Sequence, residues 1–426
     1  MQATLGVVRD RLVGEQEIGI QRPRLLMLTS NFPRWQGDST TPFVLHMAQD
    51  LLGLGWDVDV LAPHAPGAST RELLESVPVE RFRYLVPERA ETVCYGGGAL
   101  VNLRENKLNL LKLPALIAAE WTAATTRALR RQYDVIQSHW ILPQGFVGSL
   151  LPTRTPHVVT IHGGDIFGLQ GGALGAAKRF ALHRATGVTA NSSVTRQSAL
   201  DLAPRIRRLE LIPTGAEIDN DPDPSLVAKL RTNYRRPTGP LLGFVGRIVD
   251  EKGYEDFLRA IAAVVADFPD VTGIVVGEGQ HRAAAEQLSR DLGIADRVSF
   301  LGWVPAGEVQ AHMGACDVFI APSRRGVDGW IEAQGLTVIE ALASGVPTIA
   351  ARSGGIVDTI DDGETGLFVD ERAPEQIAAM VKKLCTEPEL RERLATRGRV
   401  AARERFGRST SAGAFDSLFR SLIKQD

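Results

Sequence analysis

The chain has 426 residues, of which 44% are hydrophobic and 23% charged, and its formal net charge is -2. This length exceeds what one hydrophobic core usually serves, so two or three domains are expected. The nearly balanced charge gives no reason to expect nucleic acid as a partner. Cys94, Cys316 and Cys385 are widely separated, with neither CxxC spacing nor a histidine cluster beside them, so no disulfide framework and no zinc site are indicated.

The first 22 residues carry charges at Arg9, Asp10 and Arg11 and lack the apolar core of a signal peptide. No stretch of the sequence approaches about eighteen uninterrupted apolar residues, the length that a membrane-spanning helix needs. We therefore expect residues 1–22 to be an N-terminal extension, and the protein to work in the reducing cytoplasm, neither secreted by that route nor membrane-spanning.

Residues 23–214 alternate short apolar runs, rich in β-branched residues, with longer helical patterns. The expected strands are 24–30, 56–62, 133–139, 157–163, 187–192 and 208–215. Helical candidates lie between them at 41–54, 105–131 and 193–202. This alternation is typical of βαβ units over a parallel sheet, so the N-terminal half is predicted to be a Rossmann-like domain.

Residues 215–240 contain GAEIDNDPDPS and end in RRPTGP, with little to bury, which predicts a linker. A second alternating series spans 241–405, with expected strands at 241–247, 271–279, 297–303, 317–323, 346–351 and 365–370. The predicted fold class is therefore α/β, with two doubly wound domains. In open α/β sheets ligands bind at the carboxyl ends of the strands, so residues just after strands are the functional candidates.

Two cations follow the first strand of the second domain. Arg247 comes directly after LLGFVG, and Lys252 and Gly253 precede the helical run YEDFLRAIAAVV. Charge-assisted hydrogen bonds contribute about 1.5 to 3 kcal/mol each, so this pair suits an anion. A plain surface role is disfavoured, because cations are unfavourable at the positive end of a helix.

The segment GWIEAQGLTVIEALASG contains two glutamates with a glycine between them. Because glycine costs about 1 kcal/mol inside a helix, we expect Glu332 and Gly335 to lie in a loop and a short helix to begin at Leu336. The free N–H groups of Leu336 and Thr337 then suit a phosphate. Glu340, one turn further on, suits a ribose diol; the plain alternative is an acid that the helix dipole favours by about 0.3 to 1 kcal/mol.

Further signals lie at other strand ends. HVVTIHGGDIF places His162 directly after a strand, and the twin glycines before Asp165 expose the backbone there to a ligand. A packed or surface histidine is the commoner alternative, and these two residues are too few for a metal site. SNFPRWQGDSTTPFV puts Gly37 in the loop after the first strand, and VVGEGQ is a glycine-rich turn at Glu278; each alone is weak evidence for a nucleotide.

The motifs FVGR, KG, VGEG, FLGWV, DVFIAPS, E(x7)E, ALASGVPTIA, GG and DGETGLFV, in this order, resemble those of the retaining glycosyltransferases of family 4, which have the GT-B fold. The resemblance covers about 24–424. It implies two Rossmann-like domains facing each other across a cleft, with 406–426 as a helix that crosses back to the N-terminal domain. SRRGVDGWIEAQG is similar to the subgroup that builds bacterial exopolysaccharide and capsule.

The resemblance also implies roles for single residues. Arg247 and Lys252 are similar to the cations that bind the donor diphosphate. Glu332 resembles the glutamate that contacts the transferred sugar, and Glu340 the acid that holds the nucleotide ribose. His162 is similar to the family histidine near the anomeric side of the sugar and its C6 hydroxyl. The expected catalytic set is His162, Glu332, Arg247 and Lys252, with no metal and no cofactor. The expected donor-binding set is Gly37, Asp165, Arg247, Lys252, Glu278, Val304, Gly335, Leu336, Thr337 and Glu340.

Two departures from the family pattern bear on the donor. The usual twin glycine of the first loop is Gly37 followed by Asp38, and the common EGFGL is EAQGL, with Ala333 and Gln334. The first bears on how that loop meets donor or acceptor, and the second on the choice of sugar.

The expected reaction is transfer of a sugar from a UDP- or GDP-linked donor to a hydroxyl of a polysaccharide or glycolipid intermediate, with retention at the anomeric carbon. The alternatives are a nucleotide-sugar epimerase or other non-transferase GT-B enzyme, and a silent module that binds sugar nucleotides. Residues 104–131 carry six cations and two acids among Leu, Ile and Ala. They predict either a helix that lies on the inner face of the membrane or a packed helix with a solvated basic face.

Overall fold

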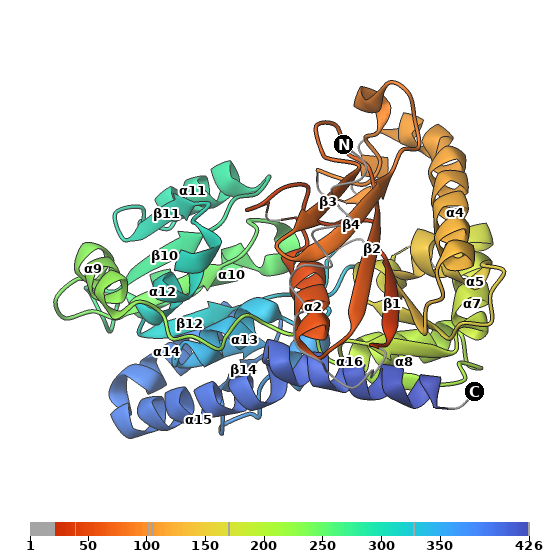
Figure 1. Ribbon diagram of the computed structural model, residues 1–426. Coiled ribbons are helices and arrows are strands. Elements are labelled where there is room, and N and C mark those ends of the chain that lie inside the picture. Colours follow the sequence, from red (N-terminus) through yellow and green to blue (C-terminus); the bar gives the residue numbers. More distant parts are fainter. Residues whose placement is uncertain are drawn as a thin grey trace.

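A computed structural model describes residues 22–38, 40–96, 98–99, 102–103, 106–168, 171–326 and 329–424. Of the predicted segments, 1–21 of the extension, residues 104 and 105 of the basic stretch, 327 and 328 of SRRGVDGWIEAQG, and 425 and 426 of the last helix lie outside these ranges. The described chain forms two separate sheets, each accompanied by its own helices (Figure 1).

The N-terminal sheet has eight strands in the order β3-β4-β2-β1-β5-β6-β7-β8. Six of them confirm predicted strands: β1 (Arg24–Leu28), β2 (Asp57–Pro63), β5 (Val135–His139), β6 (His157–Ile161), β7 (Gly187–Ala190) and β8 (Leu209–Leu211). β3 (Arg71–Leu74) and β4 (Val77–Phe82) add an antiparallel hairpin at the edge of the sheet. The apolar patterns do not predict this hairpin, because RELL and VPVERF mix charged and apolar residues.

The described helices of this domain include helices at each of the three predicted segments, together with others between the strands. They are α2 (Pro42–Gly53), η1 (Glu88–Ala90), η2 (Lys107–Lys112), α4 (Leu113–Arg130), η3 (Ile141–Gly145), α5 (Phe146–Ser149), α6 (Gly164–Phe167), α7 (Gly172–Arg184) and α8 (Ser193–Leu202). The single helix expected over 105–131 is divided into η2 and α4. Pro114 stands in the first turn of α4, where its missing N–H has no intrahelical partner to lose.

The C-terminal sheet has six parallel strands in the order β11-β10-β9-β12-β13-β14, all at predicted positions. They are β9 (Leu241–Val245), β10 (Thr272–Val276), β11 (Val298–Gly302), β12 (Val318–Ala321), β13 (Thr348–Ala351) and β14 (Leu367–Val369). Neighbouring residues of one strand enter different cores: Leu242 packs with one buried cluster and Leu241 with another. Both faces of this sheet are therefore buried, as the continuous apolar strands predict.

The helices that cover the C-terminal sheet, together with the short 3-10 turns, complete the second domain. They are α9 (Pro224–Tyr234), η4 (Asp250–Lys252), α10 (Tyr254–Val264), α11 (Arg282–Asp291), η5 (Ala306–Glu308), α12 (Val309–Gly314), α13 (Leu336–Ala343), η6 (Gly354–Asp358), α14 (Pro374–Thr386) and α15 (Pro388–Phe406).

The predicted linker contains the helix α9, so the segment 215–240 is not extended throughout. Asp223 caps this helix by accepting a hydrogen bond from Ser225 N at 2.9 Å, and a proline stands in the first turn. Arg231 and Arg235 both bind the Asp317 carboxylate, at 2.7 and 2.8 Å. The helix therefore packs on the second domain. The sequence DPDPS, which was predicted to be linker, contains the start of this helix.

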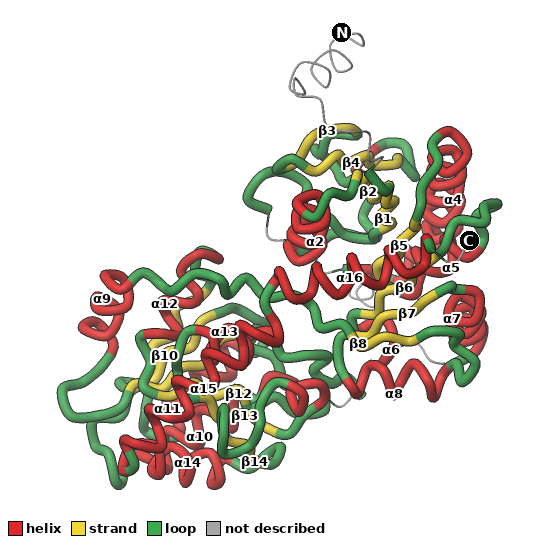
Figure 2. The backbone as a smooth tube through the Cα atoms, turned by 60° about the horizontal axis from the view of Figure 1, so that its bottom comes forward, coloured by secondary structure: helices red, strands yellow, loops and turns green. Residues whose placement is uncertain are grey.

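The last helix, α16 (Arg408–Ile423), runs back along the N-terminal domain beside α2 (Figure 2). Its Asp416 accepts a hydrogen bond from Nε1 of the buried Trp56 at 2.7 Å, and Arg408 pairs with Asp50 at 2.7 Å. Ala216 and Gly407 form an isolated parallel bridge, so the two crossings between the domains lie side by side.

Candidate active site

The turn after β9 carries the two predicted cations. Lys252 ends η4, and its Nζ forms an ion pair with Oε2 of Glu332, although the two residues lie 80 positions apart. The Lys252 ammonium also lies 5.7 Å from the ring centroid of Trp330. The Arg247 side chain is 53% exposed, with Nη2 at 3.6 Å from Glu251 Oε1. The structure thus brings the predicted cations and Glu332 into one region.

Arg324 fastens this turn to the loop that carries Glu332. Its side chain is 4% exposed; it forms an ion pair with Asp250 and binds Glu255 at 3.1 Å and Asp256 at 3.4 Å. The backbone N–H of Arg324 donates to the carbonyl oxygen of Glu251 at 2.9 Å. Sequence reasoning missed Arg324. The available signal was a cation directly after DVFIAPS, at the carboxyl end of a strand.

The segment around Gly335 has the predicted form. Gly335 is the N-cap of α13 with φ of 85°, and a Cβ there would lie 2.7 Å from Ile356 Cγ1, so this turn requires glycine. Within the described part of the chain, the N–H groups of Leu336 and Thr337 have no hydrogen-bond acceptor. Such open N–H groups at a helix start attract anions.

Glu340 lies half-buried in α13, one turn from those N–H groups. Burial raises the pKa of this carboxyl group to about 7; the negative charge of Glu217 adds to the increase, and Lys252 opposes it. Glu340 is therefore close to half ionised at neutral pH. The capacity of this carboxyl group to accept hydrogen bonds therefore increases as the pH rises through this value.

His162 follows β6 directly, as predicted. Its ring lies 5.0 Å from the rings of Phe43 and Trp140, centroid to centroid, and its Nε2 lies 3.0 Å from Nδ1 of His139. Burial lowers the pKa of His162 to about 3, so the imidazole is neutral at physiological pH. This histidine can exchange hydrogen bonds with a ligand but brings no charge to it.

Asp165 orders the loop around His162. Its Oδ1 accepts hydrogen bonds from the N–H groups of His162, at 3.1 Å, and of Gly163, at 2.9 Å. Its Oδ2 accepts one from Ile141 N at 3.0 Å. Burial raises the pKa of Asp165, and these hydrogen bonds oppose the increase. Both carboxylate oxygens are thus engaged with backbone.

The two halves of the site touch each other at the EAQGL loop. A Cβ on Gly163 would overlap the Cβ of Ala333, so the His162 loop and the Glu332 loop are in direct contact. Gln334 is 3% exposed and binds the backbone of Thr214 twice: Oε1 accepts from Thr214 N at 2.8 Å, and Nε2 donates to Thr214 O at 3.0 Å. The two residues that depart from the family pattern therefore join the domains, a role that sequence reasoning missed.

The remaining predicted residues lie in neighbouring loops. Gly37 has φ of 81° with open space around it. Asp38 beside it binds Arg34 at 2.7 Å; burial works against ionisation, but this pair lowers the pKa of Asp38 to about 2. Glu278 pairs with Arg282, and Val304 packs half-buried against the core around α13.

No set of three His, Cys, Asp or Glu side chains within the described ranges is arranged to hold a metal ion.

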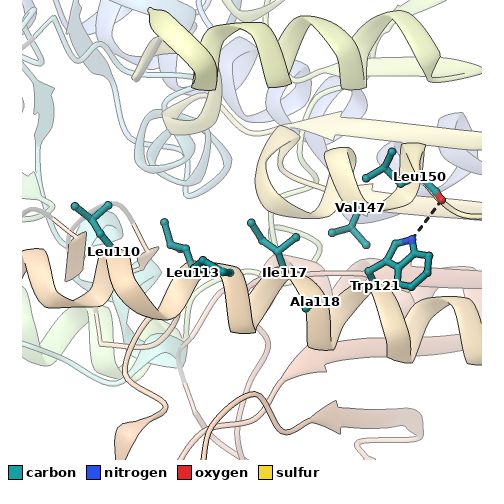
Figure 3. A pocket seen from close by; sticks show the side chains of 8 residues that line it. Leu110, Leu113, Ile117, Ala118, Trp121, Val147 and Leu150 are labelled. Carbon is teal, nitrogen blue, oxygen red and sulfur yellow. Dashed lines mark hydrogen bonds between the residues drawn. The ribbon is translucent and has the colours of Figure 1, made fainter.

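A second feature of the N-terminal domain is an apolar groove of about 600 Å³ along α4, which we call the α4 groove (Figure 3). Trp121 closes one end of it, where its Nε1 donates to Leu150 O at 3.3 Å. The other side chains that line it are all apolar and include Leu110, Leu113, Ile117, Val147 and Leu150. None of the helices in the described ranges is both long and apolar enough to span a bilayer.

Comparisons with known proteins agree with this architecture. Residues 229–401 match the family model of glycosyl transferases group 1, and residues 40–215 match that of the glycosyl transferase 4-like domain. A solved sucrose-phosphate synthase from Thermosynechococcus elongatus superposes with a TM-score of 0.75 and 22% identity, over 95% of this chain and all of that one. Anabaena HepE in complex with UDP-glucose superposes with a TM-score of 0.70 and 21% identity, over 93% of this chain and 99% of that one.

Curated relatives are glycosyltransferases. The 2-deoxystreptamine glucosyltransferase of Streptomyces kanamyceticus is 29% identical over 81% of this chain and 89% of its own length. A D-inositol 3-phosphate glycosyltransferase of Corynebacterium diphtheriae is 33% identical over 67% of this chain and 70% of its own. A GDP-mannose-dependent phosphatidylinositol monomannoside mannosyltransferase of Mycobacterium tuberculosis is 35% identical, but the match spans only 46% of this chain and 52% of that protein.

Two Rossmann-like domains, with the carboxyl-end loops of their sheets in contact, form the GT-B architecture, and the family models and relatives identify the chain as a glycosyltransferase. The chain belongs to glycosyltransferase family 4, as its motifs predicted.

Proposed function

We propose that this protein transfers a sugar from a nucleoside diphosphate donor to an acceptor hydroxyl, with retention at the anomeric carbon and without a divalent metal. The observation that carries the proposal is the meeting of Lys252, Glu332 and the start of α13 beside the loop of His162. The cation and the open N–H groups suit the diphosphate of a nucleotide sugar, and the carboxylate suits the hydroxyls of its sugar.

The diphosphate binds Lys252, Arg247 and the N–H groups of Leu336 and Thr337 in this proposal. Lys252 is paired with Glu332, so an incoming phosphate either shares the Lys252 ammonium with that carboxylate or displaces the carboxylate from it. Glu332 then accepts hydrogen bonds from sugar hydroxyls. As the bond between the anomeric carbon and the diphosphate breaks, negative charge grows on the diphosphate, and the cations stabilise it.

The acceptor oxygen forms the new bond on the face of the sugar that the diphosphate leaves, and its proton passes to a diphosphate oxygen. This scheme needs no side-chain nucleophile. The neutral His162 contacts the sugar on its anomeric side, and Glu340 holds the ribose. The base contacts lie around Glu278 and Val304, through backbone. Gly37 and Asp165 complete the donor site, Gly37 near the phosphates and Asp165 through the loop that it orders.

A panel of UDP- and GDP-sugars, scored by slow donor hydrolysis and by thermal shift, tests the donor class. One relative is named as GDP-mannose-dependent and the HepE structure is a complex with UDP-glucose, so both bases are part of the panel. An epimerase would convert the donor without releasing nucleoside diphosphate, and a silent module would bind the donor without converting it. Either outcome would contradict the proposal.

The double variant Arg247→Ala, Lys252→Ala tests the diphosphate site. Two charge-assisted bonds of about 1.5 to 3 kcal/mol each correspond to a loss of about two to four orders of magnitude in turnover. Lys382→Ala, which removes a surface cation paired with Asp267, is the matched control. Near wild-type turnover in the double variant would contradict the assignment, and loss of activity with EDTA would contradict the metal-free mechanism.

We further propose that the acceptor is lipid-linked or a growing glycan, and that the protein meets it on the cytoplasmic face of the membrane through the exposed leucines of η2, whose Leu110 also lines the α4 groove. Leu108 is 66% exposed and Leu111 79% exposed, and both lie in η2 between Lys107 and Lys112. Exposed apolar side chains flanked by cations favour an anionic bilayer.

Co-sedimentation with anionic vesicles at low and high salt tests this contact. Leu108→Glu, Leu111→Glu should lose binding, whereas Leu73→Glu, at a 69% exposed leucine of β3, should keep it. If the wild-type protein stays in the supernatant at both salt concentrations, the stretch from 106 to 131 is simply a packed helix with a basic face.

A further inference from the structure

A second histidine stands behind His162. His139 is the last residue of β5, and β5 pairs in parallel with β6, whose end leads into His162. His139 is completely buried, and its Nδ1 lies 3.0 Å from Nε2 of His162. The two ring planes are within 11° of parallel, with centroids 5.2 Å apart. The nitrogens are much closer than the centroids, so the rings meet edge to edge in a hydrogen bond.

This hydrogen bond needs one proton, and the surroundings indicate which ring carries it. Among the residues that the structure describes, Nε2 of His139 has no partner. If His162 donated from Nε2, the proton of His139 would sit on that buried, unpaired Nε2. Buried N–H groups without an acceptor are rarer than under-used acceptors, because the donor loses its water without replacement. His139 Nδ1–H is therefore the donor.

Burial lowers the pKa of both histidines, which keeps both rings neutral and leaves only one proton for the contact. With Nε2 of His162 accepting, its own proton must lie on Nδ1. Within the described chain, that Nδ1 has no hydrogen-bond partner and is not among the fully buried polar atoms. The outer edge of His162 is thus a hydrogen-bond donor that is open to a ligand.

The backbone that presents His139 is also specialised. Trp140, the next residue, has φ of 72° and ψ of 148°, a conformation that side chains other than glycine rarely adopt. Its N–H donates to Thr160 O at 2.9 Å, and Asp165 holds the following N–H. This turn places the indole of Trp140 5.0 Å from the ring of His162, so the imidazole is held by packing as well as by its hydrogen bond.

We propose that His139 is a positioning residue that holds His162 in its Nδ1–H tautomer, so that His162 donates a hydrogen bond to an oxygen of the transferred sugar. The sugar contact rests on the function proposed above. The tautomer itself does not, and it can be measured in the ligand-free protein.

The first test is side-chain nitrogen NMR of protein labelled with ¹⁵N-histidine, in which the signal of His162 is assigned by its loss in His162→Gln. We expect the protonated nitrogen of His162 to be Nδ1 in the wild-type protein. A protonated Nε2 would overturn the proposal whether or not the protein transfers sugar.

The second test compares two amides at position 139. In His139→Asn the side-chain NH2 group stands near the place of Nδ1 and preserves the donor, whereas in His139→Gln the longer side chain moves that group away. We expect the asparagine variant to keep the Nδ1–H tautomer and most of the activity. The glutamine variant should lose about ten- to a hundredfold in kcat, the range found when a partner that orients a metal-binding histidine is removed.

Binding of the free nucleoside diphosphate distinguishes positioning from general damage, since it does not involve the sugar. It should be unchanged in both variants. Equal activity of the two variants would overturn the proposal, and so would a parallel loss of nucleotide binding and of kcat. If no nucleotide sugar is turned over by the wild-type protein, the proposed function fails while the NMR result still decides the tautomer.

Discussion

The double hydrogen bond between Gln334 and Thr214 offers a quantitative test of how the domains are joined. Gln334→Met keeps the length of the side chain but removes both polar atoms. The N–H and C=O of Thr214, which is only 8% exposed, then lose their partner. Each unsatisfied buried group costs about 1 to 3 kcal/mol, so the expected loss of unfolding free energy is about 2 to 6 kcal/mol.

Urea unfolding followed by tryptophan fluorescence measures this loss. The value is taken from the transition in which the domains separate, since a two-domain chain need not unfold in one step. Gln310→Met is the matched control: its Nε2 also donates to a backbone oxygen, that of Glu217, but at an exposed position. The control should change stability by less than about 0.5 kcal/mol. If Gln334→Met does no more than the control, the contact does not join the domains.

Glu340 has a pKa of about 7 in the folded protein against an ordinary value of 4.5, so the native state holds more protons between these values and stability falls as pH rises through the interval. Glu340→Gln should flatten this part of the stability curve, and an unchanged slope would contradict the burial argument. Arg324→Met leaves three carboxylates around a vacated site and should lower stability by about 3 to 5 kcal/mol by thermal or urea unfolding. Arg393→Met, at an exposed position of α15, should change stability by less than about 0.5 kcal/mol. Trp56→Phe removes the bond to Asp416 and should loosen α16 by about 1.5 to 3 kcal/mol, seen as faster hydrogen exchange in α16; equal exchange rates would refute this anchoring role.

The strands of both domains were predictable because a parallel sheet buried on both faces imposes continuous apolar runs. The helix start at Leu336 was predictable for a local reason, the conformational demand at Gly335. The β3–β4 hairpin was not predicted, because an edge hairpin needs no continuous apolar run. α9 was not predicted because DPDPS resembles a loop, although the helix packs Leu230 into the core and binds Asp317 through ion pairs.

The site was predictable as a set of residue types at strand ends, but not as a set of contacts. Nothing local to Lys252 indicates that its partner is Glu332. The choice of Gln334 likewise depends on a backbone 120 positions away. His139 ends a predicted strand, but its contact with His162 depends on the pairing of β5 with β6, which the sequence does not indicate. Side-chain pairing across the sheet and across domains is a tertiary property, which patterns along the chain do not encode.

The neighbouring crossings at Ala216 and Gly407 determine how the two domains can move. One connecting segment between two domains allows rotation in any direction. Two adjacent connecting segments restrict the rotation to one axis. Gln334 forms hydrogen bonds to Thr214, two residues from Ala216, where a rotation about this axis displaces atoms least. We therefore expect any opening of the domains to displace their far edges more than the loop that carries Glu332, which stays bound to Thr214.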